Sequence, residues 1–169
     1  KQLTLKDYSV KYLKWMNNKK IMEFIEQKYF KHTKKKIIEF IEAKQRSKHE
    51  YLYGIFVKNS LKAKSNLCHI GNIKLGPINF YHKSSFISYF IGEKKYWGMN
   101  IATIVIKKVL KIARKKFKLK KISACFYKNN IGSQRVLEKN GFAKEAEFKS
   151  QLIYKNKRVN HIYYGKILK

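Results

Sequence analysis

Residues 96–106 read YWGMNIATIVI, a lone glycine turn followed by an apolar run. From Ile101 the apolar side chains recur at helical spacing with lysines opposite them, which predicts an amphipathic helix over 101–116. Asn100 is a suitable N-cap, and Gly98 has no Cβ to keep a ligand from its backbone. Because a helix N-terminus offers unpaired N–H groups and the positive end of the helix dipole, this turn is a candidate anion site.

The segments around this turn alternate between strand and helix patterns. Strands are expected at 51–57, 69–75, 78–82, 85–91, 121–127, 143–154 and 158–168. Helices are expected from an Asp7 cap to the Asn17-Asn18 pair, at 21–27, from a Thr33 cap to near Ser47 with Ile37, Ile38, Phe40 and Ile41 on its buried side, and at 131–140. Residues 59–66 read as a polar loop, and Gly76-Pro77 as a bend. Strand 85–91 lacks a charged face and is expected to be central, and the crossover through helix 101–116 should be parallel and right-handed.

The composition predicts one packed domain covering residues 1–169. Of the residues, 44% are hydrophobic and 15% aromatic, and there is no linker or repeat. Cys68 and Cys125 lie far apart and give neither a disulfide framework nor metal-ligand spacing, so we expect a reduced cytoplasmic setting and no metal. No apolar run approaches the roughly 20 residues that a membrane-spanning helix needs.

The net charge is +30, from 40 Lys and Arg against 10 Asp and Glu. Such a field attracts nucleic acid, anionic membranes or phosphorylated small molecules. Only four of the basic residues are arginines, the residue type that suits bidentate phosphate and base recognition. The joint richness in Lys, Ile, Asn, Tyr and Phe also looks like a general residue bias. The charge therefore has two readings, a compositional background and an aid to phosphate binding.

A second motif lies at 129–142, NNIGSQRVLEKNGF, with Asn130, Ser133, Leu137, Lys139, Gly141 and Phe142 at a characteristic spacing. Together with YFIGEKKYWGMNIA at 89–102, it resembles the GCN5-related N-acetyltransferases (GNAT). The nearest branch contains the ribosomal-protein alanine acetyltransferases and the bacterial amino-sugar N-acetyltransferases. YLKWMNN at 12–18, HIGNIKL at 69–75 and the last two strands extend the resemblance over nearly the whole chain.

The resemblance implies a mixed α/β fold whose mostly antiparallel sheet of six to seven strands is flanked by helices and splays at two parallel central strands. It also implies acetyl-CoA as co-substrate. The implied cofactor residues are Phe90, Ile91 and Gly92 for the pantetheine arm, Lys95, Tyr96, Trp97, Gly98, Met99, Asn100, Ile101, Ala102 and Thr103 for the pyrophosphate, and Asn130 and Lys139. Lys95, Asn100 and Ala102 depart from the residues usual in the family.

Acetyl transfer to an amine needs an unprotonated amine, donors for the oxyanion and a proton source near the sulfur. A backbone N–H near Ile91 suits the oxyanion. Many family members protonate the thiolate with a tyrosine at the position of Leu137. Ser133, which matches a serine of the ribosomal branch, is the first alternative acid. Its hydroxyl could equally have only a structural role, bonding the backbone in the first turn of the helix. Tyr127 is the second alternative acid, and its structural alternative is a packed, half-buried aromatic side chain.

Glu93 is the candidate base. The alternative is a solvated loop carboxylate with no catalytic role. The glutamate frequent on a strand of the family falls near Phe86 and is missing. His69 titrates in a suitable range but is more typical of a structural residue, and ordered water is a further option. Cys125 is expected to be a buried strand residue rather than an acyl carrier.

Trp15, Asn17 and Lys28 are the candidate substrate contacts: the indole suits a sugar or nucleobase, or simply the core, and the lysine suits a phosphate. The expected function is direct N-acetylation of a small primary amine, on a nucleotide-linked amino sugar of surface glycan synthesis. A protein N-terminus is the alternative acceptor. A basic nucleic-acid-binding module is the alternative class, which the core-periodic aromatics disfavour because single-strand binders expose theirs. The oligomeric state stays open between monomer and homodimer.

Overall fold

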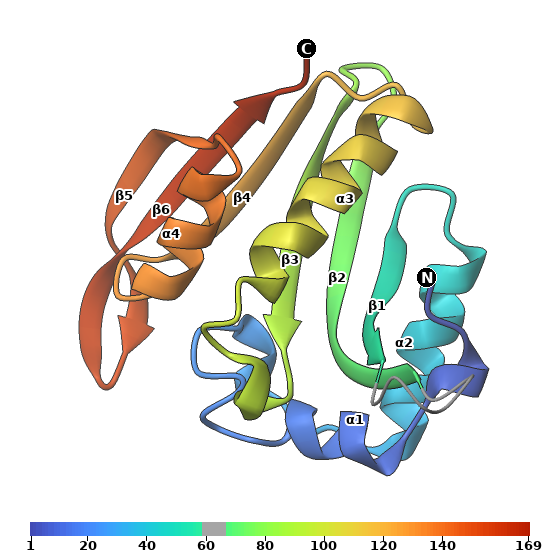
Figure 1. Ribbon diagram of the computed structural model, residues 1–169. Coiled ribbons are helices and arrows are strands. Elements are labelled where there is room, and N and C mark those ends of the chain that lie inside the picture. The colour runs from blue at the N-terminus through green and yellow to red at the C-terminus, as the bar shows by residue number, and fades with distance from the viewer. Residues whose placement is uncertain (59–66) are drawn as a thin grey trace. The chain divides into compact units, whose positions relative to one another are not determined.

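The computed structural model describes residues 1–58 and 67–169 (Figure 1). The loop expected at 59–66 lies outside the described residues. The chain forms two compact units. Unit 1 comprises Lys1–Lys74 and Tyr89–Ile101, and unit 2 comprises Leu75–Ser88 and Ala102–Lys169. The expectation of a single domain stays a prediction.

Within the described residues, six strands form one sheet in the order β1-β2-β3-β4-β6-β5, as the mixed α/β expectation requires. Their bounds are β1 Tyr51–Lys58, β2 Leu67–Asn79, β3 Ser84–Ile91, β4 Lys121–Tyr127, β5 Ala143–Tyr154 and β6 Lys157–Ile167. β3 is central, and its pairing with β4 is parallel. The parallel register contains three residue pairs, from Ser84–Lys121 to Phe86–Ser123, and both strands extend beyond the last of these pairs. The second half of β3 therefore has no register partner in β4.

The first helix of unit 1 begins later than expected. The bounds in this region are η1 Leu5–Asp7, α1 Val10–Met16, η2 Glu26–Tyr29 and η3 Lys94–Tyr96. Asp7 does not cap α1, because its carboxylate accepts the backbone N–H of Thr4 at 2.9 Å. Ser9 is the cap instead, and its hydroxyl accepts the N–H of Tyr12 at 3.1 Å.

The helix predicted at 21–27 is absent, and turns followed by the short η2 stand in its place. The Asn18 side chain explains the difference, since its Oδ1 accepts the N–H groups of Lys20 and Ile21 at 3.0 and 3.1 Å. An asparagine that bonds nearby backbone in this way competes with helix formation. Met22 is nevertheless fully buried and anchors the segment.

α2 (Lys34–Arg46) begins at the predicted Thr33 cap, whose hydroxyl accepts the Lys36 N–H at 3.3 Å. Ile37 and Ile41, one turn apart, are buried as expected. Phe40 was expected on the buried side but is 39% exposed. It lies at the edge of the apolar face, where the Lys44 ammonium sits 5.2 Å from its ring.

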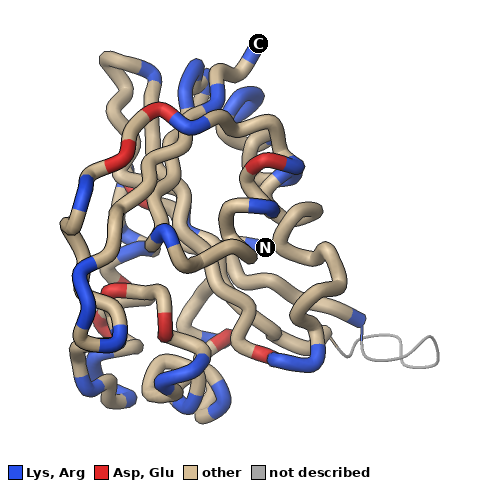
Figure 2. The backbone as a smooth tube through the Cα atoms, turned by 90° about the vertical axis from the view of Figure 1, so that its left-hand side faces the viewer, with Lys and Arg blue, Asp and Glu red and all other residues tan. Residues whose placement is uncertain are grey.

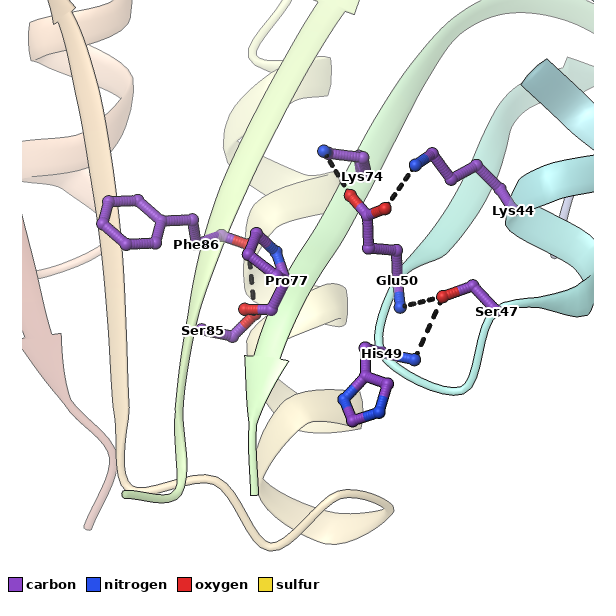
Figure 3. Close-up of polar contacts among 8 residues, drawn as sticks. All are labelled: Lys44, Ser47, His49, Glu50, Lys74, Pro77, Ser85 and Phe86. Atoms are coloured by element: carbon purple, nitrogen blue, oxygen red, sulfur yellow. Dashed lines mark hydrogen bonds and ion pairs between the residues drawn. The ribbon is translucent and has the colours of Figure 1, made fainter. Parts of the chain in front are cut away.

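A network around Glu50 fixes the junction between α2 and β1 in unit 1 (Figure 3). Ser47 Oγ accepts the N–H groups of His49 and Glu50 at 3.1 and 2.9 Å. The Glu50 carboxylate binds Lys44 through one oxygen and Lys74 through the other, the latter at 2.6 Å. Burial alone would raise the pKa of Glu50, but the two lysines lower it below its usual value.

In unit 2, β2 continues through Gly76-Pro77, which has a cis peptide bond, rather than breaking into two strands there. Ser85 Oγ donates to the Pro77 carbonyl at 3.1 Å (Figure 3). The strand expected at 78–82 ends at Asn79, because Asn79 Oδ1 accepts the His82 N–H at 2.8 Å and starts a turn.

The helices of unit 2 match their predictions. α3 (Ile101–Lys115) buries Ile106, Val109, Leu110 and Ala113, and its lysines are exposed. α4 (Ile131–Lys139) is followed by Gly141 in the left-handed conformation, φ +74°. No described helix is long and apolar enough to cross a membrane.

The closing strands β5 and β6 pair antiparallel, as expected.

Cys125 on β4 is exposed, so its assignment as a buried residue is wrong. Ile122, Ala124 and Phe126 alternate on one buried face of β4, whereas Cys125 lies on the opposite face; Tyr127, at the end of the strand, is also buried.

Candidate functional site

The end of β3 is held by the neighbouring strand β2 within unit 1. The N–H groups of Gly92 and Glu93 both donate to the Ile70 carbonyl, at 2.7 and 3.2 Å. Because peptide groups alternate along a strand, those of Ile91 point to the other edge. The Ile91 carbonyl accepts a 2.8 Å hydrogen bond from the Trp97 indole. Sequence reasoning assigned Ile91 and Trp97 to the same ligand but did not predict this bond.

The turn after η3 leaves space beside Gly98. Gly98 has φ +77°, and a Cβ built there would meet no atom within 4 Å. Asn100 has φ +56°, a left-handed conformation that asparagine tolerates better than most residues. This differs from the extended backbone of a helix N-cap, so Asn100 departs from its expected capping geometry.

Thr103, in the first turn of α3, carries a buried hydroxyl with no hydrogen-bond partner in the part of the chain that the structure describes. The first turn of α3 also contains no acidic residue. A buried polar atom without a partner is uncommon in native proteins and calls for an explanation. A bound anion or hydroxyl-bearing ligand at the helix start would supply one.

Glu93 is held by two side chains from α1. The Trp15 indole Nε1 donates to Glu93 Oε1 at 2.9 Å, and the Lys11 ammonium lies 3.2 Å from the same oxygen. The other carboxylate oxygen, Oε2, has no partner among residues 1–58 and 67–169. The Glu93 side chain is 22% exposed. Glu93 therefore presents a fixed acceptor oxygen, unlike a freely solvated loop carboxylate.

Trp15 is buried, at 3% exposure, in the core of unit 1. A Cβ added to Gly92 would lie 2.2 Å from the indole, so the ring packs directly on that backbone. In this arrangement the ring faces protein rather than solvent, and its polar edge orients Glu93. The stacking role expected for Trp15 stays a prediction that this packing does not favour.

Lys11 was not identified from the sequence. Besides Glu93, its ammonium lies 3.6 Å from the Cys68 sulfur and 5.5 Å from the centre of a Trp15 ring. Nothing local in KYLKW distinguishes Lys11 from the many other lysines. Only the contact with Glu93, far along the chain, singles it out.

His69 sits in an aromatic cluster, stacked on Phe56 at 4.9 Å and edge-on to Trp15 at 5.1 Å. Its Nε2 lies 2.8 Å from Asn72 Oδ1 and 3.0 Å from the Gly71 carbonyl, which assigns the proton to Nε2. Burial lowers the pKa of His69, so the ring is neutral at pH 7. These contacts fit a structural histidine, and its role as a base stays untested.

Asn17 and Lys28 lie in the segment that follows α1. The Asn17 side-chain amide forms two hydrogen bonds with the His32 backbone: it accepts the N–H at 3.0 Å and donates to the carbonyl at 3.0 Å. Lys28 donates to the Glu23 carbonyl at 3.0 Å and lies 4.9 Å from the Tyr29 ring. Both side chains shape the segment, and their substrate roles stay predictions.

Unit 2 contains the other predicted residues. Asn130 caps α4 by accepting the Ser133 N–H at 3.0 Å. Tyr127 is buried, and its ring lies 6.4 Å from that of Tyr154. Leu137 is fully buried, so the position that holds a tyrosine in many family members is part of the core in this chain. Lys139 is exposed at the end of α4. No cluster of metal-binding side chains occurs among the described residues.

A family profile described as the acetyltransferase (GNAT) domain matches residues 1–143. The chain belongs to the GNAT acetyltransferase family. A curated relative, the probable N-acetyltransferase YjcK of Bacillus subtilis (strain 168), is 33% identical over 115 residues. That alignment covers 68% of this chain and 57% of the relative, so the chain spans little more than half of the relative's length.

Solved structures share the GNAT fold. The spermidine N-acetyltransferase from Vibrio cholerae, in complex with CoA and spermine, superposes with a TM-score of 0.84 at 18% identity, over 99% of this chain and 93% of that one. RimL, a ribosomal L7/L12 N-acetyltransferase bound to CoA, gives 0.77 at 16%, over 94% and 86%. The microcin C7 immunity acetyltransferase MccE, with acetyl-CoA and AMP, gives 0.76 at 18%, over 94% and 86%. At these identities the likeness establishes the fold, and the predicted branch stays a prediction.

Proposed function

We propose that this chain is an acetyl-CoA-dependent N-acetyltransferase that transfers the acetyl group directly to a primary amine of a nucleotide-linked amino sugar. The single observation that carries the cofactor assignment is the turn at Gly98, where a Cβ added to the left-handed backbone would meet no atom within 4 Å, before a helix start without acidic residues. The unpartnered Thr103 hydroxyl fits the same ligand.

The residues of the turn and helix start, Gly98 to Thr103, would hold the diphosphate through backbone N–H groups. Acetyl-CoA supplies an activated acyl carbon when bound. The peptide groups of Ile91, which β4 does not pair, suit the pantetheine arm and the developing negative charge on the carbonyl oxygen. The Ile91 carbonyl becomes available to the arm only when Trp97 releases it.

Glu93 Oε2 accepts the proton from the acceptor ammonium, so that the free amine attacks. Trp15 and Lys11 hold the opposite oxygen and fix the direction of Oε2. The proton for the leaving thiolate comes from Ser133 or Tyr127, since Leu137 has no proton to give. Ser133 is the preferred residue because Tyr127 is packed in the core.

The charge of unit 1 favours an anionic acceptor over a polyamine. Unit 1 has seven acidic residues, and every one has a partner. Five of these pair with lysine or arginine: Asp7, Glu39, Glu42, Glu50 and Glu93. Basic positions outnumber acidic ones along the backbone (Figure 2). A polycation would meet repulsion here, whereas a nucleoside diphosphate would be attracted.

A protein N-terminus is the second candidate, since RimL shares the fold. A basic enzyme would dock poorly on basic ribosomal proteins, which disfavours it. The structure of MccE with acetyl-CoA and AMP supports the proposal of a nucleotide-bearing acceptor.

The test is an acetyl-CoA turnover assay that compares UDP-linked amino sugars, spermidine and N-terminal peptides as acceptors. We expect kcat/KM for an amino-sugar nucleotide to exceed that for spermidine at least tenfold, and raised salt to narrow the difference. Faster turnover of spermidine would overturn the acceptor class. Failure of all three acceptors while acetyl-CoA still binds would also count against it.

A further inference from the structure

A long basic stretch of the sequence falls in and around α3. Between Glu93 and Glu138 the chain has thirteen lysines and arginines and no acidic residue. Unit 2 contains three carboxylate side chains, Glu138, Glu145 and Glu147, all on α4 or β5. The acidic residues of unit 2 are therefore segregated from α3.

These three carboxylates are already engaged. Glu145 pairs with Lys121 at 2.8 Å, and Glu147 pairs with Lys128 at 3.3 Å and with Lys144. Glu138 accepts hydrogen bonds from the Gln134 amide and the Tyr164 hydroxyl, at 2.9 and 3.0 Å. None of them neutralises a lysine of α3.

The outer side of α3 and the turn after it form what we call the basic face: Lys107, Lys108, Lys111, Lys115, Lys118 and Lys120. All six are exposed, and their ammonium groups have no hydrogen-bond or ion-pair partner within 1–58 and 67–169. Lys107–Lys111 and Lys111–Lys115 are like-charge pairs at i,i+4, a spacing that destabilises a helix. The helix dipole compensates in the last turn, but not at Lys107 and Lys108.

A hollow adjoins the basic face within unit 2. It has a volume of roughly 400 Å³ and is lined by Lys107 and Leu110 of α3, Lys139, Asn140 and Gly141 after α4, and Lys166 of β6. The Lys166 ammonium donates to the Asn140 carbonyl at 2.7 Å. Three lysines and no acidic side chain line this hollow, so it extends the positive surface. Because Lys139 is also an implied cofactor residue, the proposal below rests on the six lysines of the basic face.

We propose that the basic face binds the phosphate backbone of double-stranded nucleic acid, independently of the acetyl-transfer site. Lys107 to Lys115 spans about 12 Å of helix. At about 3.4 Å of axis per phosphate on one strand, this length matches three or four phosphates. α3 contains no aromatic residue on which unpaired bases would stack, which favours a duplex over a single strand. Lysines rather than arginines predict contact without base-specific readout.

The test is fluorescence anisotropy with the full chain and a labelled 20-base-pair duplex, as DNA and as RNA, over a salt series. We expect binding whose log K falls with log[salt] at a slope of about −3, as three to four phosphate contacts require. The test variant carries Lys107→Glu, Lys108→Glu and Lys111→Glu. The control carries Lys149→Glu on β5, Lys155→Glu in the β5–β6 turn and Lys157→Glu on β6, with the same change in net charge.

We expect the α3 variant to lose at least 30-fold in affinity and the control less than 3-fold. A milder variant with glutamine at the same three α3 positions guards against misfolding and should lose about 10-fold. Equal losses in the α3 variant and the control would overturn the proposal, because binding would then follow net charge alone. Tighter binding to anionic vesicles than to either duplex, or displacement of the duplex by saturating acetyl-CoA, would also overturn it.

Discussion

Trp15 and Glu93, 78 positions apart in the sequence, are joined by a 2.9 Å hydrogen bond from the buried indole to one carboxylate oxygen. Lys11 binds the same oxygen, which leaves the second oxygen of Glu93 without a protein partner in the described chain. The polar edge of the buried Trp15 indole is therefore directed at the Glu93 carboxylate.

Trp15→Phe keeps most of the packing and removes the N–H donor. We expect kcat to fall about tenfold, with little change in acetyl-CoA affinity. Glu93→Gln alone should lower kcat by about 10² or more, as loss of a base does. In the Glu93→Gln background, Trp15→Phe should have almost no further effect if Trp15 acts only by positioning the Glu93 carboxylate, as we propose. Steady-state kinetics of the four proteins give this coupling, and strictly additive effects would contradict it.

Trp97→Phe removes the hydrogen bond to the Ile91 carbonyl and leaves that acceptor open. If the pantetheine arm pairs with this carbonyl, releasing Trp97 costs binding energy, and the variant should bind coenzyme A about fivefold more tightly, equivalent to about 1 kcal/mol. Calorimetry with coenzyme A measures the change. Weaker binding would show that the indole itself contacts the ligand, contrary to the account.

Asn17→Ala removes the two hydrogen bonds to the His32 backbone that hold together the ends of the segment from 18 to 31. We expect faster trypsin cleavage at Lys19, Lys20 and Lys28, and a severalfold higher KM for the acceptor with acetyl-CoA affinity unchanged. Limited proteolysis followed by mass spectrometry reports the cleavage. Asn156→Ala, in the β5–β6 turn, is a control that should leave these sites protected.

Glu50→Gln should lower the free energy of unfolding at pH 7 by about 1–2 kcal/mol, because two lysines lose their charged partner. The pKa of Glu50 is lowered in the folded state. Its stabilisation is therefore fully present above the unfolded value of about 4.3 and is lost as the pH falls through the lower folded value. Urea titrations between pH 7 and pH 3 should show variant and wild type converging in acid. Glu39→Gln, at an exposed pair, should cost little.

The sequence predicted most of the regular structure because periodicity and turn residues act locally. Strands β1, β3, β4, β5 and β6 and helices α2, α3 and α4 lie where the patterns place them. The errors arose where a side chain bonds nearby backbone. Asn18 holds turns in place of a helix, Ser9 rather than Asp7 caps α1, and Asn79 ends β2 early.

The candidate site was only partly predictable. Glu93 and the turn at Gly98 followed from position and resemblance, but the partners of Glu93 did not. Lys11 looks like any other lysine in a lysine-rich chain, and a tryptophan at helical spacing reads as either core or contact. The Trp97–Ile91 bond depends on a loop that folds back on its own strand. Such contacts are set by tertiary packing, which local patterns do not encode.

The most direct test of the account is the affinity for acetyl-CoA of Gly98→Asp against Gly98→Asn, measured by calorimetry. Both side chains tolerate the left-handed backbone at this position, and they differ in charge. The account predicts that the asparagine variant binds within about fivefold of wild type, whereas the aspartate variant loses at least 100-fold because a carboxylate faces the diphosphate. Equal affinities for the two variants would show that the diphosphate does not bind at this turn.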